Sequence, residues 1–177
     1  MQLGMVGLGK MGANMTTRLQ QSGHSVVAFD RSADAVAATV KESGAAGAAS
    51  LAELVGKLGA SPKVVWIMVP AGKPTDDTID TLCGLLGNGD VIIDGGNTNY
   101  KEGLAAYDRC KAKGVSLVDA GTSGGVWGLK EGYCLMVGGD DFAVKACKPV
   151  FTTLAPAKGY AHVGPAGAGH FSKMVHN

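Results

Sequence analysis

The sequence lacks a charge imbalance, a long apolar run and a cysteine motif, and each absence argues against a class of function. Sixteen lysines and arginines face 15 acidic residues, giving a formal net charge of +1. This balance provides no electrostatic basis for binding nucleic acid or an anionic membrane surface. No apolar run approaches the roughly 18–20 residues that cross a bilayer, and no signal peptide precedes the first apolar stretch. We therefore expect a cytoplasmic protein with no membrane or nucleic-acid partner.

Cysteine is scarce and scattered, whereas glycine is abundant. The four cysteines form no Cys-x-x-Cys pair and have no histidine at metal-ligand spacing, so we expect reduced thiols in or near the core and no metal. The 28 glycines are more than twice the usual share of roughly 7%. Most of them occur in pairs or short motifs, which indicates turns and ligand-binding loops. The apolar share of 46% fits a globular domain.

Short apolar runs alternate with helix-like segments along the whole chain. The predicted strands are QLGMVGLG, SVVAFD, KVVWIMV, DVIID, VSLVDA, YCLMVGG and YAHVG. Helices are predicted after an N-cap at Ser32 and over 10–22, 75–86, 100–113, 140–153 and 169–177. Strands bounded by glycine and proline that alternate with such helices indicate a mostly parallel sheet covered on both faces. We therefore predict an α/β fold with a doubly wound, Rossmann-like sheet.

The hexapeptide GLGKMG places Gly7, Gly9 and Gly12 in the Gly-x-Gly-x-x-Gly spacing. The first glycine permits a tight turn, the second lets a pyrophosphate approach the backbone, and the third lets helix and strand pack closely. The helix that starts here offers unpaired N–H groups and a partial positive charge to phosphates. The spacing alone is weak evidence in so glycine-rich a chain, but its position between a first strand and a helix strengthens it.

An acidic residue, Asp30, ends the second predicted strand about 20 residues after this turn. At that position it would accept hydrogen bonds from the adenosine ribose, although a carboxylate there could also cap a strand end. Its charge would repel a 2′-phosphate and so favours NAD. Arg31 and Ser32 follow at once and could bind that phosphate, while Arg31 could equally stack on adenine or face solvent. We predict dinucleotide binding, with NAD preferred and NADP possible.

Three further glycine-rich motifs follow predicted strands, where open α/β sheets place their ligands. They are DGGNTNY (94–100), GTSGGVWG (121–128) and GPAGAGHFSKMVHN (164–177). Each alone could be a tight turn. Together with GLGKMGANM, the order of these motifs resembles 6-phosphogluconate dehydrogenase, a decarboxylating family of the β-hydroxyacid dehydrogenase group. The VWG sequence and the acid after the second strand resemble the shorter, bacterial-type branch.

The resemblance implies a role for each matching residue. It implies cofactor binding by Gly7, Leu8, Gly9, Lys10, Met11, Gly12, Asp30, Arg31, Ser32, Val69, Pro70 and Asn97. It implies contacts to the substrate, 6-phosphogluconate, from Asn97, Ser123, Gly124, Gly125, Lys173, His176 and Asn177. Lys173 would be the general base, and His176 and Asn177 would orient the substrate hydroxyls. His176 and Asn177 follow Lys173 by three and four positions, so both can lie on the helix face of Lys173.

The implied reaction gives Lys173 a definite task in the oxidation of 6-phosphogluconate to ribulose 5-phosphate and CO₂. As hydride leaves C3, the 3-hydroxyl must lose its proton, and a lysine with a lowered pKa can accept it. The resulting β-keto acid loses CO₂, and protonated Lys173 can donate to the carbonyl oxygen. Apart from the resemblance, a lysine on a helix is more often a solvated cation.

Residues 1–163 are predicted to form the dinucleotide-binding domain, and residues 164–177 the start of a long interdomain helix that ends without a stop signal. The resemblance implies that an all-helical domain follows, with a glutamate as general acid, the phosphate-binding residues and a homo-oligomer interface. We therefore expect this chain to bind cofactor in the pentose phosphate pathway enzyme but to be inactive alone. Two alternatives stay open: a dehydrogenase of a small acid such as 3-hydroxyisobutyrate, and a non-catalytic dinucleotide-binding sensor.

Overall fold

The computed structural model describes residues 1–59 and 61–177. Its strands are β1 (Gln2–Val6), β2 (Ser25–Phe29), β3 (Ala46–Gly47), β4 (Val64–Ile67), β5 (Val91–Asp94), β6 (Ser116–Ser123), β7 (Cys134–Gly138) and β8 (Tyr160–Gly164). Its helices are α1 (Lys10–Gln21), α2 (Ala33–Ser43), α3 (Leu51–Lys57), α4 (Lys73–Leu85), α5 (Tyr100–Ala112), the 3₁₀ turn η1 (Gly125–Trp127), α6 (Gly128–Glu131), α7 (Asp141–Leu154) and α8 (Ala168–His176).

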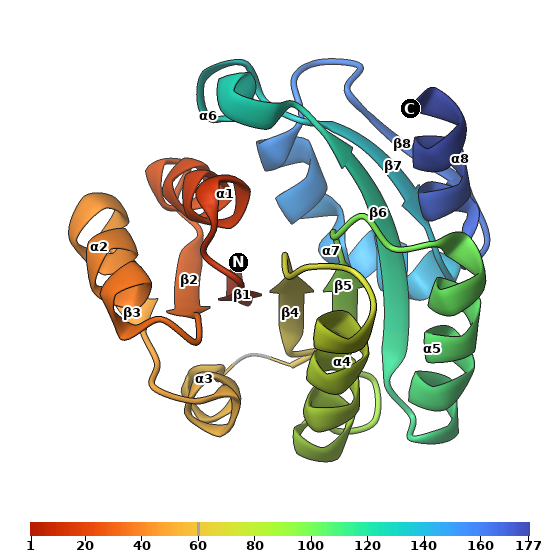
Figure 1. Cartoon of the computed structure of the whole chain (residues 1–177), viewed down its shortest axis with the longest axis horizontal. Helices are drawn as coiled ribbons and strands as arrows, with labels where there is room; N and C mark the ends of the chain where they lie inside the picture. The colour runs from red at the N-terminus through yellow and green to blue at the C-terminus, as the bar shows by residue number, and fades with distance from the viewer. Residues whose placement is uncertain (60) are drawn as a thin grey trace.

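The strands form a single sheet in the order β3-β2-β1-β4-β5-β6-β7-β8 (Figure 1). Every neighbouring pair is parallel except β6 and β7, which are antiparallel. The predicted doubly wound, mostly parallel sheet is therefore confirmed. Strand order reverses between β1 and β4, because β2 lies on one side of β1 and the later strands lie on the other. Ligands of open α/β sheets bind beyond the strand ends at such a switch point.

The central strands are buried on both faces, which explains their unbroken apolar sequences. In β4, Val64 and Trp66 belong to one core, and Val65 and Ile67 belong to the other. Successive side chains of a strand point to opposite faces, so a strand covered by helices on both sides has no polar face.

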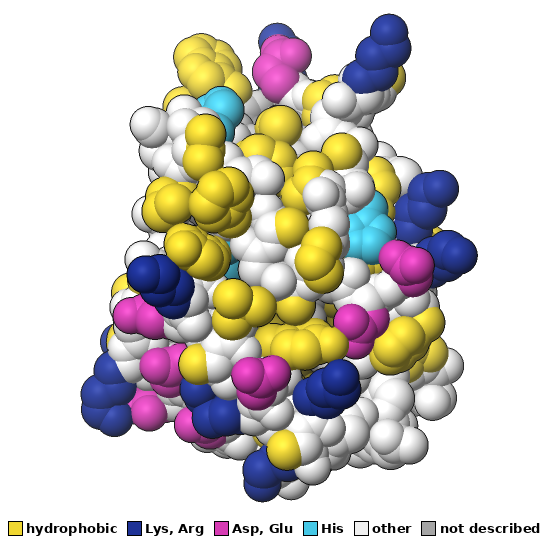
Figure 2. Space-filling model, turned by 90° about the vertical axis from the view of Figure 1, so that its right-hand side faces the viewer, with side chains coloured by type: hydrophobic (Ala, Val, Ile, Leu, Met, Phe, Trp, Pro, Cys, Tyr) yellow, Lys and Arg dark blue, Asp and Glu magenta, His cyan; other side chains and the backbone are white. Residues whose placement is uncertain are grey.

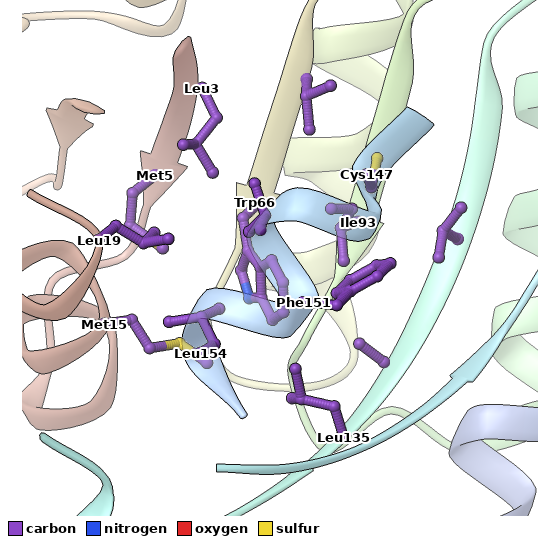
Figure 3. Close-up of a cluster of buried hydrophobic side chains, with 14 of the residues drawn as sticks. Leu3, Met5, Met15, Leu19, Trp66, Ile93, Leu135, Cys147, Phe151 and Leu154 are labelled. Atoms are coloured by element: carbon purple, nitrogen blue, oxygen red, sulfur yellow. The ribbon is translucent and has the colours of Figure 1, made fainter. Parts of the chain in front are cut away.

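The first core lies between the sheet and helices α1 and α7 (Figure 3). Trp66 of β4 meets Phe151 of α7 edge to face, with ring centroids 5.8 Å apart and an interplanar angle of 67°. Met15 and Leu19 of α1 are fully buried in the same cluster. This packing fixes the start of α1 next to the ends of β1 and β4.

The second core lies on the opposite face, between the sheet and helices α3, α4 and α5. Leu54, Ile79 and Leu82 supply its main aliphatic side chains. Cys83 and Cys110 are buried here with their sulfurs 3.1 Å apart, and all four cysteines of the chain are free thiols. Cys134 is exposed, so the expectation that every cysteine lies in or near the core was wrong for this residue.

Most predicted helices occur within two residues of their predicted limits, but two segments were missed. Ser32 caps α2 as predicted, since its hydroxyl accepts the Ala35 N–H at 3.2 Å. Helix α3 was not predicted, although Ser50 accepts the Glu53 N–H at its start in a Ser-x-x-Glu pattern typical of helix N-termini. The turn η1 and helix α6 lie in a stretch for which the sequence predicts no helix.

Helix α8 packs on β6 and β7 beside α5, and its outer face is apolar. Figure 2 shows the face of the molecule that carries α5 and α8, where hydrophobic side chains gather. Phe171, Met174 and Val175 of α8 are exposed, and so are Leu104 of α5 and Val163 of β8. In the part of the chain that the structure describes, no helix is both long and apolar enough to span a membrane.

Candidate active site

The three glycines of the GLGKMG turn occupy three different environments. Gly7 has φ of +96°, and a Cβ on it would meet the Met68 carbonyl oxygen. A Cβ on Gly12 would meet the Gly7 carbonyl oxygen, so this residue lets α1 lie directly against the turn. Gly9 has no neighbour within 4 Å of the Cβ position and is exposed. Two of the glycines therefore serve the fold, and the middle one leaves the backbone open to a ligand.

The N-terminus of α1 faces this open space, and no side chain caps it. Gly9 is the N-cap residue, no side chain caps the helix, and its first turn contains no acidic residue. Lys10 is exposed at the first position of the helix. The unpaired N–H groups and the positive end of the helix dipole are therefore available to an anion such as a phosphate.

The carboxylate of Asp30 is held at the mouth of the same turn. One of its oxygens accepts the Leu8 N–H at 2.7 Å, and the other accepts the Ser32 N–H at 2.8 Å. Each oxygen keeps a free lone pair, because a carboxylate oxygen accepts two hydrogen bonds. Arg31 is exposed beside it, and the Ser32 oxygen is engaged in capping α2. An acceptor for hydroxyl groups is therefore preorganised at the end of β2.

A cleft of about 420 Å³ opens beyond the ends of β4, β5 and β6. It is lined by Met11, Met68, Val69, Pro70, Ala71, Gly95, Gly96, Asn97, Thr122, Lys173 and Asn177. Six of these residues were predicted from the sequence, and the cleft brings them together from α1, α8 and two loops. The other five were missed, although four of them lie within two positions of predicted residues in the MVPAG and GGN stretches. Thr122 gave no separate signal.

Lys173 and Asn177 enter the cleft from α8, one turn apart. Lys173 is half-buried, and its Cβ lies 2.7 Å from the position that a Cβ on Gly121 of β6 would occupy. Gly121 is therefore the residue that lets this part of α8 approach the sheet. His176 is exposed and is not among the residues that line the cleft.

The buried start of α8 is held by Asp119 of β6. One carboxylate oxygen accepts the Gly167 N–H at 2.8 Å, and the other accepts the His170 N–H at 2.9 Å. Burial raises the pKa of Asp119 above its ordinary value, although nearby His170 and the N–H donors favour the charged form. A Cβ on Gly169 would meet the backbone oxygens of Met136 and Asp119, so a side chain there has no room. Gly169 is thus explained by contact between the helix and the sheet, whereas Gly167 has φ of +91° and packs against Leu104 of α5.

A second buried carboxylate, Asp94, organises the loop that carries Asn97. Asp94 accepts the Gly96 N–H at 3.0 Å and the Thr98 hydroxyl at 2.7 Å, and it lies 3.2 Å from His170 Nε2. Burial disfavours the ionised carboxyl, but His170 and the other donors outweigh it and lower the pKa of Asp94. Sequence reasoning assigned no catalytic or binding role to Asp94, Asp119 or His170.

The Ser123–Gly125 segment lies outside the cleft lining. Gly124 and Gly125 have φ of +157° and +48°, and they lead from β6 into η1. A Cβ on Gly124 would lie 2.8 Å from the Tyr133 ring, so this turn is pressed onto that side chain. Trp127, at the end of η1, is 71% exposed. The substrate contacts predicted for residues 123–125 are therefore not part of the cleft in this structure.

The parallel sheet with its switch point, the glycine turn open at Gly9 and the acid after β2 define a dinucleotide-binding domain of the Rossmann type. A family model described as the NAD binding domain of 6-phosphogluconate dehydrogenase matches residues 2–164. The chain therefore belongs to this family, and it is an NAD-binding domain.

Two curated relatives are longer than this chain. An NAD(+)-dependent, decarboxylating 6-phosphogluconate dehydrogenase of Haloferax volcanii is 46% identical over 178 residues, which cover 100% of this chain and 58% of that protein. A Bacillus subtilis protein of the same name is 35% identical over 181 residues, covering 99% of this chain and 39% of that protein. The chain thus spans well under two thirds of each relative.

Solved structures repeat the fold. The Plasmodium falciparum 6-phosphogluconate dehydrogenase, studied in its apo form and with NADP+ and 6-phosphogluconate, matches with a TM-score of 0.93 and 28% identity over 100% of this chain and 40% of that one. A Mycobacterium tuberculosis 3-hydroxyisobutyrate dehydrogenase with L-serine matches with a TM-score of 0.89 and 28% identity over 99% of this chain and 58% of that one.

Proposed function

We propose that this chain is the cofactor-binding part of a cytoplasmic, NAD-linked 6-phosphogluconate dehydrogenase of the pentose phosphate pathway. The enzyme would oxidise and decarboxylate 6-phosphogluconate to ribulose 5-phosphate and CO₂. The observation that carries the proposal is the cleft that joins Asn97, Lys173 and Asn177 to Met11 beside the glycine turn. It is supported by the relatives' names and by the identity to the Haloferax volcanii protein.

The cofactor would lie along the ends of β1, β2 and β4. The α1 N-terminus, open at Gly9, would bind the pyrophosphate, and Asp30 would accept the adenosine ribose hydroxyls with its free lone pairs. Val69 and Pro70 would line the path toward the cleft, where the nicotinamide would lie. NAD is preferred because a 2′-phosphate would meet the negative charge of Asp30, although exposed Arg31 leaves NADP possible.

Lys173 would be the general base of the oxidation step. When C3 gives up hydride to a bound nicotinamide, the amine of Lys173 would take the proton of the 3-hydroxyl. The bond between the carboxylate carbon and C2 would then break and CO₂ would leave. The electron pair of the broken bond stays on the sugar and forms the enediol. Protonated Lys173 returns its proton to the former carbonyl oxygen. The carbon protonation that completes the reaction is assigned to a glutamate beyond Asn177.

The remaining predicted residues would hold the sugar acid. Asn97 and Asn177 line the cleft with Lys173 and can bond hydroxyl groups on the substrate. His176 and the Ser123–Gly125 turn lie outside the lining, so their proposed contacts require the substrate to extend past this cleft. The exposed apolar face of α8 would pack against a helical domain that also builds the homo-oligomer.

The runner-up is a dehydrogenase of a small acid such as 3-hydroxyisobutyrate, favoured by the structural match to the Mycobacterium tuberculosis protein. The proposed full-length enzyme should be supplied with NAD+ and 6-phosphogluconate labelled at its carboxylate carbon. We expect NADH and labelled CO₂ in equal amounts. NADH without CO₂, or turnover of 3-hydroxyisobutyrate alone, would favour the runner-up. A non-catalytic sensor would turn over neither substrate, and its function would survive Lys173→Met.

A further inference from the structure

Three ionisable side chains form a buried cluster behind the cleft. They are Asp94 at the end of β5, Asp119 of β6 and His170 of α8, which are 2%, 4% and 2% exposed. Asp94 and Asp119 are direct neighbours across the parallel pair of β5 and β6. None of the three lines the cleft. They are therefore placed to act through other residues and not on a ligand directly.

The Asp94 side of the cluster controls the loop that carries Asn97. Its carboxylate accepts both the Gly96 N–H and the Thr98 hydroxyl, which flank Asn97 on either side. Asn97 itself is exposed and lines the cleft. The position of the Asn97 side chain thus depends on where the Asp94 carboxylate is held.

The Asp119 side of the cluster controls the helix that carries Lys173. Asp119 accepts the N–H groups of Gly167 and His170, at the start of α8. Lys173 follows His170 by three positions, so it lies one turn further along the same helix. Movement of the first turn of α8 would therefore move Lys173 with it.

His170 joins the two sides. Its Nε2 lies 3.2 Å from the Asp94 carboxylate, while its backbone N–H is bound to Asp119. Burial disfavours the imidazolium, but the hydrogen bond and charge of Asp94 and the charge of Asp119 outweigh it and raise the pKa of His170. From α5, Gly103 packs so closely that a Cβ there would lie 3.1 Å from the imidazole Cδ2. The charges that face His170 from the packed strands are therefore both negative, and the ring has little room to turn.

We propose that His170 is a positioning residue whose side chain, through its contact with Asp94, ties the Asn97 loop to α8. It thereby fixes Asn97 relative to Lys173, although it contacts neither cofactor nor substrate. This inference rests on the proposed function, because it assumes that the nicotinamide lies in the cleft that Asn97 and Lys173 line.

The test compares two ligands that differ only at the cleft end. NADH and ADP-ribose share the adenosine and pyrophosphate, but only NADH carries the nicotinamide. Calorimetric titration of this chain with both ligands gives an NADH preference, the ratio of the two affinities. In His170→Gln, which keeps a side-chain donor but loses the charge, we expect ADP-ribose affinity within about twofold of wild type and at least a fivefold loss of the NADH preference.

A second variant and a control separate positioning from folding. Thr98→Val removes one hydrogen bond to Asp94 and leaves His170 in place. It therefore tests the positioning of the Asn97 loop even if His170→Gln does not fold. We expect it also to lower the NADH preference. His162→Gln alters a histidine of β8 that lies outside the cleft, and it should leave both affinities unchanged. The wild-type preference should also fall as the pH rises and His170 loses its proton, whereas His170→Gln should show no such fall.

The outcomes are distinguishable. Binding of neither ligand by the wild type would refute the proposed function and this inference with it. Equal binding of the two ligands by the wild type, or an NADH preference that survives both variants at every pH, would overturn the inference alone. Loss of the preference with retained ADP-ribose binding would support it.

Discussion

Substituting Gly9 by alanine should separate cofactor binding from stability. Gly9 is exposed, has φ of −63° and ψ of −174°, and has nothing within 4 Å of its Cβ position. An alanine therefore fits the folded chain without a clash or a left-handed backbone. The added methyl group would instead occupy the space through which a pyrophosphate approaches the start of α1.

The stability change at Gly9 should be small because two effects oppose each other. Replacing glycine by alanine at a compatible backbone conformation restricts the unfolded chain and stabilises a protein by about 0.4–1 kcal/mol. Alanine is, however, a poorer N-cap than glycine, and N-cap losses are typically about 1 kcal/mol. The net change should stay within about 1 kcal/mol, which shifts the melting temperature of a domain of this size by about 2–4 °C at most.

The binding change should be much larger. A methyl group over the turn would prevent one close phosphate contact to the backbone, and hydrogen bonds to charged groups contribute about 1.5–3 kcal/mol. Since about 1.4 kcal/mol corresponds to a tenfold change in affinity, NADH should bind at least about tenfold more weakly.

Calorimetric titration and thermal unfolding of Gly9→Ala, Gly12→Ala and Gly56→Ala would check this reasoning. Gly12→Ala should lower the free energy of unfolding by about 1–3 kcal/mol or more, because the added Cβ would meet the Gly7 carbonyl oxygen. Gly56 of α3 is exposed and has open space around its Cβ position. Gly56→Ala should therefore raise the free energy of unfolding by about 0.5–1 kcal/mol and leave NADH binding unchanged. Unchanged NADH affinity in Gly9→Ala would refute the assignment of this turn.

Three further predictions concern Asp30, Lys173 and His170. Asp30→Ala should weaken NADH binding at least about tenfold and NADPH binding less. Asp34→Asn on α2 should change neither affinity. Titration of both variants with both ligands measures these changes. In the proposed full-length enzyme, Lys173→Met should lower kcat by a factor of about 10²–10⁴ while NADH binding is retained. Lys145→Met on α7 should leave kcat unchanged. Equal activity of the two variants would exclude the general-base role. The pKa of His170 is raised above 6.5, so its stabilising contribution is complete below pH 6.5 and is lost as the pH rises through the folded pKa. Urea unfolding at several pH values should show this loss in wild type but not in His170→Gln, and parallel curves would contradict it.

The fold could be predicted because its signals are local and repeated. The apolar run of β4 and the glycine turn before α1 each follow from simple steric and burial rules. Helix α3 and the η1–α6 segment were missed because both are short. The Ser50 and Glu53 pattern at the start of α3 was the available signal.

The candidate site could be predicted only where a residue lies next to a motif. Val69, Asn97 and Lys173 follow strands or belong to a motif, and they line one cleft. The link between Asp94 and His170 joins residues 76 positions apart, so it depends on the packing of α8 against the sheet. No local pattern in a single sequence carries that contact.

The most direct test of the central claim is a calorimetric titration of this 177-residue chain with NADH and with NADPH. We predict saturable binding of both at one site, with NADH the tighter ligand because Asp30 accepts from the ribose hydroxyls. Absence of binding would contradict the dinucleotide site itself. Tighter binding of NADPH would contradict the role of Asp30 and indicate that Arg31 and Ser32 bind the 2′-phosphate.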